Sequence, residues 1–380
     1  MAPKPVQDFT PSSLVLVTGA NGHVAQHVVS QLLSRPVANR PRIRATVRSA
    51  SSEAGLATVF SQEIASGALQ IVRVPDIAAA DAFDSAIVGC THVAHIASPL
   101  VVGAADVEKD VLIPAVQGTL SLLKAAARSS SVEAVVITSS FAAVLDPAFD
   151  LRPGYTYTPA DWNPIDYETA ADPNLDLSPW PAKYRPFITY MASKKLAEKA
   201  AWDFYAEYLT LTPSDSHLHS HSHSHSHSPS RWRLTVICPT YIGGPCVLPL
   251  PKGPQSLSFS NQLIWNTAVS KPADSLPQID FPYWVDVRDV AKAHIRALTT
   301  PQADRERFIL APTKRTYSEI ADVARKTCGF TPSTEKQTLH CFDIVSDNCA
   351  TILGLTEWVS FEDMVAQTVQ QVKGSGSEPH

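Results

Sequence analysis

The sequence predicts an α/β protein with a doubly wound parallel sheet and a smaller second lobe weighted toward the C-terminus. Short β-branched runs alternate with helix-period segments, as expected where crossover helices connect parallel strands. The first run is Leu14 to Val17, and an apolar face at Val24, Val28 and Leu32 predicts the helix that follows it. With 380 residues, the chain is expected to form one compact unit of two lobes.

The other strands of the sheet are predicted at further β-branched runs. They are Ile43 to Val47, Leu69 to Val74, Val93 to Ala97, Val135 to Thr138 and Leu234 to Cys238. Alanines, leucines and valines at helical spacing also predict a helix from Ala104 to Ala127, with a bend or a break at Pro114.

Two stretches interrupt this alternation. Residues 146–186 are rich in prolines and aromatic residues, which predicts a long ordered loop over one face of the sheet, in a position to cover an active site. Residues 213–230 include an alternating His/Ser tract whose composition cannot form a packed core, so we expect a disordered surface insertion. Because the tract lacks acidic or cysteine ligands, we expect no specific metal site there.

Composition argues against several classes of protein. The chain has 31 Lys and Arg residues against 36 Asp and Glu residues and no dense basic block, so neither a nucleic acid nor a membrane is an expected partner. No apolar stretch approaches the roughly 20 residues that cross a bilayer, and no hydrophobic signal region opens the chain, which predicts a cytoplasmic protein. The six cysteines are scattered, which predicts buried reduced thiols rather than disulfides or a zinc site.

The turn after the first predicted strand has a glycine pattern typical of a Rossmann-type dinucleotide site. Gly19 permits a tight turn, Gly22 lets the backbone approach a pyrophosphate, and the small Ala25 lets the helix pack on its strand. These glycines can also serve the turn alone, but the strand before them and the amphipathic helix after them favour dinucleotide binding. The phosphates would lie at the helix N-terminus, near Asn21, His23 and Val24.

The end of the second predicted strand indicates which dinucleotide binds. An NAD-preferring site usually offers an acidic residue to the ribose there, whereas this chain has Arg44 and Arg48. A guanidinium can bind a 2′-phosphate in bidentate fashion, so Arg48 favours NADP(H), the alternative being a solvated surface arginine. Asp76 and Ile77 follow the third strand, where a carboxylate can accept a hydrogen bond from the adenine amino group. The alternative is that Asp76 caps a helix.

A tyrosine and a lysine four residues apart predict the catalytic chemistry. Tyr190 and Lys194 lie on one face of a predicted helix, where Cβ atoms are roughly 5–6 Å apart. A nearby ammonium favours phenolate, so we expect a lowered pKa for Tyr190 and a role as an acid near neutral pH. Ser139 and Ser140 end a predicted strand, where a hydroxyl can bond a substrate carbonyl. The alternative for Tyr190 and Lys194 is a pair on the surface of a helix, and the alternative for the two serines is a simple turn. The occurrence of all three features in the correct order on a dinucleotide-binding pattern favours catalysis.

These motifs resemble the extended short-chain dehydrogenase/reductase family, in the branch that holds plant dihydroflavonol reductases and yeast NADPH-dependent methylglyoxal reductase. The resemblance covers nearly the whole chain. Its marks are Thr18-Gly19-x-x-Gly22, Arg44 to Arg48, His95 to Pro99, Gly118-Thr119, Thr138 to Ser140, Asp161 to Pro164, Tyr190-x-x-Ser193-Lys194-x-x-Ala197-Glu198, Pro239 to Pro245 and Trp284 to Ala291.

The resemblance implies roles for individual residues. The catalytic triad is expected to be Ser140, Tyr190 and Lys194, with Ser140 preferred as the second serine of its pair, and Lys194 is also expected to hold the nicotinamide ribose. The implied cofactor contacts are Arg48 at the 2′-phosphate, Asp76 and Ile77 at adenine, Ala97 along the dinucleotide, and Pro239 and Ile242 at nicotinamide. Two positions depart from the family pattern: Ala25 replaces a third glycine, and Ser52 replaces a phosphate-binding lysine of some relatives, which weakens NADP selectivity.

We therefore expect a dinucleotide-binding domain at 12–210, completed by 231–245 and 284–298, and a substrate lobe at 241–283 and 299–372. The motifs and the resemblance together imply NADPH-dependent reduction of a ketone or aldehyde. The lobe is rich in Trp, Phe, Leu and Pro, which favours a medium-sized apolar carbonyl compound, such as an intermediate of specialised metabolism. The alternatives are a sugar-nucleotide epimerase or dehydratase with tightly bound NAD, and a non-catalytic dinucleotide sensor. Relatives suggest a monomer or a homodimer.

Overall fold

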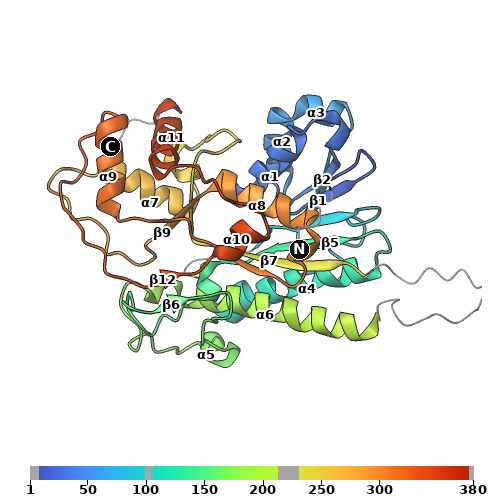
Figure 1. Cartoon of the computed structure of the whole chain (residues 1–380), viewed down its shortest axis with the longest axis horizontal. Helices are drawn as coiled ribbons and strands as arrows, with labels where there is room; N and C mark the ends of the chain where they lie inside the picture. Colours follow the sequence, from blue (N-terminus) through green and yellow to red (C-terminus); the bar gives the residue numbers. More distant parts are fainter. Residues whose placement is uncertain (1–7, 99–103, 105, 213–230, 376–380) are drawn as a thin grey trace, which may run out of the picture.

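The computed structural model describes residues 8–98, 104, 106–212 and 231–375. Its centre is a parallel seven-stranded sheet in the order β10-β7-β5-β4-β1-β2-β3 (Figure 1). The strands are β1 (Leu14–Val17), β2 (Arg42–Val47), β3 (Leu69–Arg73), β4 (His92–His95), β5 (Ala134–Thr138), β7 (Arg233–Pro239) and β10 (Arg307–Leu310). The strand order reverses between β1 and β4, and such a switch point is where doubly wound sheets bind their ligands.

All six strands predicted for this sheet are confirmed. β4 stops at His95, two residues before the predicted end, because the Thr18 hydroxyl accepts the N–H groups of Ile96 and Ala97. The seventh strand, β10, lies inside residues 299–372, which the sequence assigned to the substrate lobe. That part of the domain assignment is wrong, since β10 pairs with β7 and extends the central sheet.

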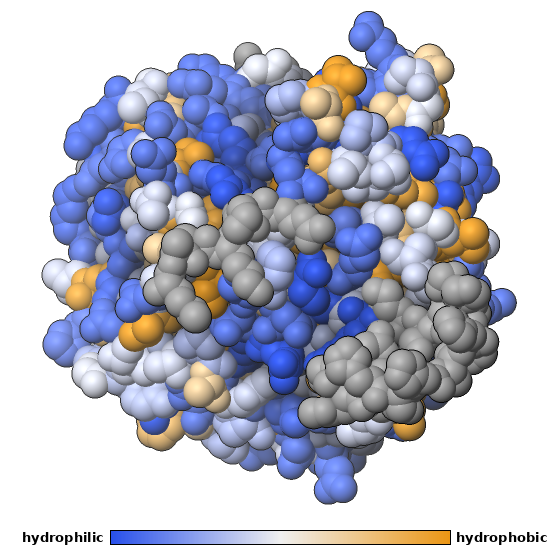
Figure 2. Space-filling model, turned by 45° about the vertical axis from the view of Figure 1, so that its right-hand side comes forward, coloured by the Kyte–Doolittle hydropathy of each residue, from blue (hydrophilic) through white to orange (hydrophobic). Residues whose placement is uncertain are grey.

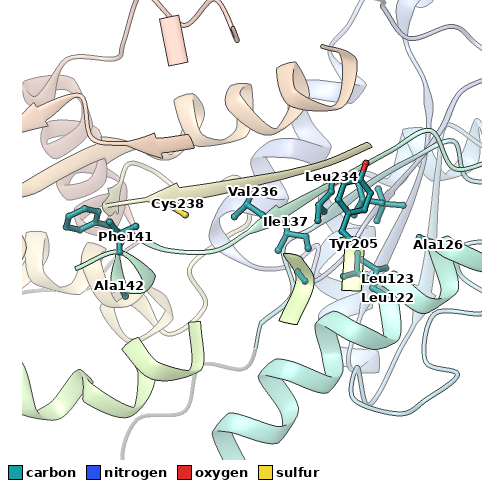
Figure 3. Packing of buried hydrophobic residues seen from close by; sticks show 14 of the residues in the cluster. Leu122, Leu123, Ala126, Ile137, Phe141, Ala142, Tyr205, Leu234, Val236 and Cys238 are labelled. Carbon is teal, nitrogen blue, oxygen red and sulfur yellow. The ribbon is translucent and has the colours of Figure 1, made fainter. Parts of the chain in front are cut away.

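Helices cover both faces of the sheet. On one face lie α1 (His23–Leu33) and α8 (Val287–Thr299), with α2 (Ala50–Val59) and α3 (Ser61–Ala65) beside β2 and β3; on the other lie α4 (Ile113–Arg128) and α6 (Ile188–Leu211). Figure 3 shows Leu122 and Leu123 of α4, Tyr205 of α6, Ile137 of β5 and Val236 of β7, which belong to one buried cluster. These buried contacts fix α6 against the sheet.

The predicted break at Pro114 is confirmed. A short π-helical turn spans Glu108–Leu112, and α4 begins at Ile113 with Pro114 in its first turn. Because proline has no N–H to donate, the hydrogen-bond pattern of the helix changes where the π-helical turn meets α4. Regular helix therefore starts later than the predicted Ala104.

Residues 146–186 have little regular structure, as the sequence predicts. They contain β6 (Thr156–Tyr157) and α5 (Tyr167–Ala171), and β6 pairs with β12 (Asp343–Ile344). In Figure 1 this segment lies beside α6, at the lower left of the molecule. The His/Ser insertion at 213–230 lies outside the described residues.

The second lobe has a core of its own. Helices α7 (Phe259–Ala268), α9 (Tyr317–Thr327) and α11 (Phe361–Gly374) pack together at the left of Figure 1. A small sheet of β8 (Tyr241–Gly243), β9 (Tyr283–Asp286) and β11 (Thr313–Lys314) joins this lobe to the central sheet, and α10 (Asp347–Thr351) packs near β10.

The coloured surface in Figure 2 is mostly hydrophilic, with apolar residues in scattered groups. No helix in the described part of the chain is both long and apolar enough to span a bilayer. Four cysteines are buried, but Cys246 and Cys341 are only half-buried, so the expectation of buried thiols is wrong for these two. The described residues contain no cluster of three His, Cys, Asp or Glu side chains suited to a metal.

Candidate active site

A cavity of about 250 Å³ lies where β5 and β7 end, between the central sheet and the second lobe. Two kinds of side chain dominate its lining. Hydroxyl groups come from Thr138, Ser139, Ser140, Tyr190, Thr240, Ser258 and Ser260, and aromatic rings come from Phe141, Phe187, Tyr241, Phe259 and Phe281. Such a mixture suits an apolar ligand that is oriented by a few polar groups.

The structure brings Ser140, Tyr190 and Lys194 together in this lining. Ser140 lies two residues after the end of β5 and caps a short 3₁₀ helix, where its hydroxyl accepts the Ala142 N–H at 3.1 Å. Ser140 and Tyr190 line the same cavity, and the Ser140 hydroxyl acts to lower the pKa of Tyr190. Tyr190 and Lys194 lie one turn apart near the start of α6, so strand end and helix start converge on the cavity.

The expected lowering of the Tyr190 pKa is wrong. Burial raises the pKa of Tyr190, and the neighbouring Ser140 hydroxyl only opposes that effect. Lys194 is not among the groups that shift this pKa; its ammonium donates to the Thr138 carbonyl at 3.3 Å and to Ser98 Oγ at 3.2 Å. The phenol is therefore protonated at neutral pH, which is the state that a proton donor requires.

Burial also lowers the pKa of Lys194, to about 8, while Cys238 and Glu198 act in the opposite direction. Desolvation disfavours the charged form of a buried amine, and a nearby anion favours it. Lys194 therefore titrates in a range where a pH profile of the enzyme can report its charge.

The turn between β1 and α1 has the shape that a pyrophosphate requires. Gly19 adopts a φ of +65°, which suits glycine, and a Cβ there would meet Ala97 Cα at 3.0 Å. Gly22 caps α1 without a side-chain bond, and the first turn of the helix has no acidic residue. The leading N–H groups of a helix have no partner within it, so this end favours an anion.

Arg44 and Arg48 have different environments. Arg44 donates to the carbonyls of Ala86 and Val88 and to Gln70, so it is a structural residue. Arg48 follows the end of β2, is exposed, and makes no hydrogen bond or ion pair with the described residues. Only Arg48 is thus free to bind a phosphate.

The predicted adenine and dinucleotide contacts lie along the same edge of the sheet. Asp76 is exposed and one of its oxygens accepts the Ala78 N–H at 2.9 Å, so it caps a local turn. Ile77 and Ala97 line a smaller cavity that Lys194 shares with the larger one. A Cβ on Gly118 would meet Ile77 Cδ1 at 2.9 Å, which explains a glycine at this point of α4.

Four other predicted cofactor residues, His23, Val24, Pro239 and Ile242, line the main cavity, whereas Asn21 is exposed. The His23 ring lies 3.0 Å from the Gly244 carbonyl and 3.3 Å from Ser258 Oγ. Burial and the neighbouring His27 lower the pKa of His23 to about 4, so the ring is neutral. His23 therefore joins the glycine turn to the second lobe and offers no charge to a phosphate.

The long loop does not take part in the cavity as expected. None of residues 146–186, all of which are described, belongs to its lining. The loop packs instead behind the strand ends, where the Asn163 side chain donates to the Ala142 carbonyl at 3.1 Å. The expectation that this segment covers the site is therefore wrong. The aromatic wall comes from other segments, and no sequence motif marks its residues, although the aromatic composition of 241–283 hinted at them.

The fold and this cavity define a dinucleotide-binding protein of the reductase type, and comparisons with known proteins agree. Residues 16–154 match the model of the 3-beta hydroxysteroid dehydrogenase/isomerase family. The chain is 32% identical over 317 residues to the NADPH-dependent methylglyoxal reductase of Saccharomyces cerevisiae, covering 81% of each chain. It is 32% identical over 300 residues to aldehyde reductase 2 of Sporidiobolus salmonicolor, covering 78% of this chain and 75% of that one.

A solved structure shows the same arrangement over the whole chain. The crystal structure of the yeast methylglyoxal/isovaleraldehyde reductase in complex with NADPH superposes with a TM-score of 0.79 at 28% identity, covering 96% of this chain and 99% of the other. The chain belongs to the extended short-chain dehydrogenase/reductase family, in the branch of the methylglyoxal reductases and the dihydroflavonol reductase-like enzymes.

Proposed function

We propose that this protein reduces a ketone or an aldehyde to an alcohol with NADPH, and that Tyr190 is the general acid. The observation that supports it most directly is that Ser140, Tyr190 and Lys194 line one cavity together with the residues expected at the nicotinamide, Pro239 and Ile242. A phenol and a serine hydroxyl that meet in one cavity can bind the same carbonyl oxygen.

The residues present fit NADP(H). The open glycine turn at Gly19 and Gly22 suits the pyrophosphate, and the free guanidinium of Arg48 suits the 2′-phosphate. The yeast reductase described above is named as NADPH-dependent, and its crystal structure is a complex with NADPH. Ala97 and Ile77 would lie along the dinucleotide, and Lys194 would hold the nicotinamide ribose.

NADPH, when bound, supplies the hydride, and the chain supplies orientation and a proton. Ser140 donates a hydrogen bond to the carbonyl oxygen and polarises the C=O bond. Tyr190 then donates its phenolic proton to the oxygen as negative charge develops there, so the product is the neutral alcohol. The raised pKa of Tyr190 keeps that proton in place until the alkoxide, a stronger base than phenolate, forms.

The cavity favours a neutral, apolar carbonyl compound. Among the described residues that line it, Lys194 is the only one that carries a charge at neutral pH, because His23 is neutral. No second cation is therefore available for the diphosphate of a sugar nucleotide, and five aromatic rings offer an apolar surface instead. We infer a medium-sized ketone or aldehyde as substrate. Cytoplasmic location and a monomeric or homodimeric state remain predictions.

The test is a cofactor and substrate assay on the purified full chain. We expect NADPH oxidation in the presence of methylglyoxal and of larger apolar diketones, and release of any bound nucleotide on gel filtration. Retained NAD with conversion of a UDP-sugar and no NADPH oxidation would identify an epimerase or dehydratase instead. NADPH binding without turnover of any carbonyl compound would indicate a dinucleotide sensor.

A further inference from the structure

A buried carboxylate lies one helical turn beyond Lys194. Tyr190, Lys194 and Glu198 follow one another at intervals of four on α6, so they share one face of the helix. Glu198 is 1% exposed and forms an ion pair with Arg307 of β10, which is 6% exposed. Charges buried this deeply destabilise a protein unless they are paired and hydrogen-bonded.

Donors from several elements occupy both oxygens of Glu198. Arg307 donates from Nε to Oε1 at 2.6 Å and from Nη2 to Oε2 at 3.2 Å. The Ser139 hydroxyl donates to Oε2 at 2.6 Å, and Trp202 Nε1 donates to Oε1 at 3.2 Å. The carboxylate therefore connects α6 with the residue after β5 and with β10, the edge strand of the sheet.

The bond from Ser139 bears directly on Ser140. Ser139 is also held by its backbone, because its N–H donates to the Ile237 carbonyl at 2.8 Å. Ser140 has extended backbone angles, φ −161° and ψ 154°, and successive side chains in extended backbone point to opposite sides. With the Ser139 side chain held toward Glu198, the Ser140 side chain is directed to the opposite side, and Ser140 lines the same cavity as Tyr190.

Arg307 anchors the other side of this network. Its guanidinium donates to the carbonyls of Pro159 at 3.0 Å and Ala143 at 3.3 Å, and it lies 3.9 Å from the centre of the Trp162 ring. The long loop and the 3₁₀ turn after Ser140 are thereby fixed to the same ion pair.

Glu198 also acts on the charge of Lys194. Burial lowers the pKa of Lys194 to about 8, and Cys238 and Glu198 oppose this. Burial raises the pKa of the Cys238 thiol, so the thiol is neutral and the carboxylate is the remaining anion. The other titratable groups that face Lys194 are neutral: His95 of β4, whose pKa burial lowers to about 3, and the Tyr190 phenol. The positive charge of Arg307 is paired with Glu198 itself.

We propose that Glu198, held by Arg307, is a positioning residue of the active site: it orients Ser140 through Ser139 and keeps Lys194 in its ammonium form. This rests on the proposed function, because it assigns to Ser140 and Lys194 the roles given there.

The test is the pH dependence of kcat/KM in Glu198→Gln. Glutamine keeps the shape and can still accept from Ser139, but it removes the negative charge. We expect the alkaline limb of the profile to move to lower pH by on the order of one unit, since a nearby opposite charge shifts a pKa by about that much or more. The matched control is Asp304→Asn, because Asp304 binds Tyr205 of α6 and Leu234 of β7 at the far end of the same elements. Its profile should keep the wild-type limb.

Two further variants keep the test decisive if Glu198→Gln does not fold. The double variant Glu198→Gln/Arg307→Met removes the unpaired cation and should show the same shift. Ser139→Ala retains both charges, so it should lower kcat about tenfold and leave the limb in place. An unshifted limb in every folded variant that lacks the Glu198 charge, or wild-type kcat in Ser139→Ala, would overturn the proposal. A wild-type protein that reduces no carbonyl compound would instead overturn the proposed function.

Discussion

The nucleotide-binding side and the substrate-facing side of the cavity are built by different means. On the first, backbone geometry does most of the work: Gly19 forms a turn that other residues would strain, and α1 presents free N–H groups to a phosphate. On the second, aromatic rings converge from separate segments, among them Tyr241 of β8 and Phe259 of α7. The nucleotide side is therefore defined locally, whereas the substrate side depends on how the second lobe packs.

The largest expected effect is at the junction of the two sides. Tyr190→Phe removes the proton donor and leaves the glycine turn intact, so kcat should fall by about 10²- to 10⁴-fold while NADPH affinity stays near that of the wild type. Steady-state kinetics and quenching of protein fluorescence by NADPH measure the two quantities. Tyr205→Phe is the control, because Tyr205 lies on the same helix and bonds Asp304 away from the cavity. Tyr190→Phe turnover within tenfold of the wild type would refute the assignment.

On the nucleotide side, Arg48→Ala should weaken NADPH binding about 10- to 100-fold, the equivalent of about 1.5–3 kcal/mol for hydrogen bonds to a charged group. NADH binding should change little, since NADH lacks the 2′-phosphate. Titrations of both nucleotides measure the difference. Arg44→Ala serves as the control: its contacts are internal, so it should lower the melting temperature without changing the preference for NADPH. Equal losses for both nucleotides in Arg48→Ala would make Arg48 a structural residue.

On the substrate side, Phe259→Ala should raise KM for a bulky apolar ketone about tenfold and change KM for methylglyoxal far less, because only the larger compound reaches the ring. Initial rates measured with each substrate separately give the two KM values and their ratio. Phe149→Ala, which removes a half-exposed ring of the long loop outside the cavity lining, should leave the ratio unchanged. A uniform rise for both substrates would contradict a role in substrate selection.

The smallest expected effect concerns the alkaline limb of the pH–activity profile. The ammonium of Lys194 is the working form, so activity should be full below its pKa of about 8 and decline as the pH rises through it. Tyr190 contributes no limb in that range because its pKa is raised. Lys194→Arg should move the decline to higher pH, at whatever rate remains, because a guanidinium stays protonated. A limb that stays at the same pH in this variant would belong to another group.

Local patterns explain why much of the fold and of the nucleotide site could be predicted. The strands that precede Gly19 and Ser140 are short β-branched runs, and the turn residues that follow them act within a few positions of the chain. Arg48 could be placed at a strand end for the same reason. The choice of Ser140 over Ser139 came from family resemblance, and its physical basis, the bond from Ser139 to Glu198, is visible only in the structure.

What could not be predicted depends on contacts between distant residues. β10 is a four-residue strand that begins with Arg307. A charged residue is not expected in a buried strand, and the Arg307 charge is tolerated there because it pairs with Glu198, 109 residues away. The direction of the Tyr190 pKa shift could not be predicted because the spacing of four residues shows the nearby lysine but not the burial of the phenol. The aromatic wall was missed because its rings meet only after the second lobe folds.

The most direct test of the account is isotope transfer. The full chain is incubated with NADPH deuterated at C4 of the nicotinamide and with an apolar diketone, and the alcohol is analysed by mass spectrometry and NMR. The account predicts one deuterium at the new carbinol carbon and one NADP⁺ for each alcohol formed. Two results would contradict it. One is alcohol that contains no deuterium both when one face of C4 is labelled and when the other face is labelled. The other is isomerised sugar nucleotide with no net oxidation of NADPH.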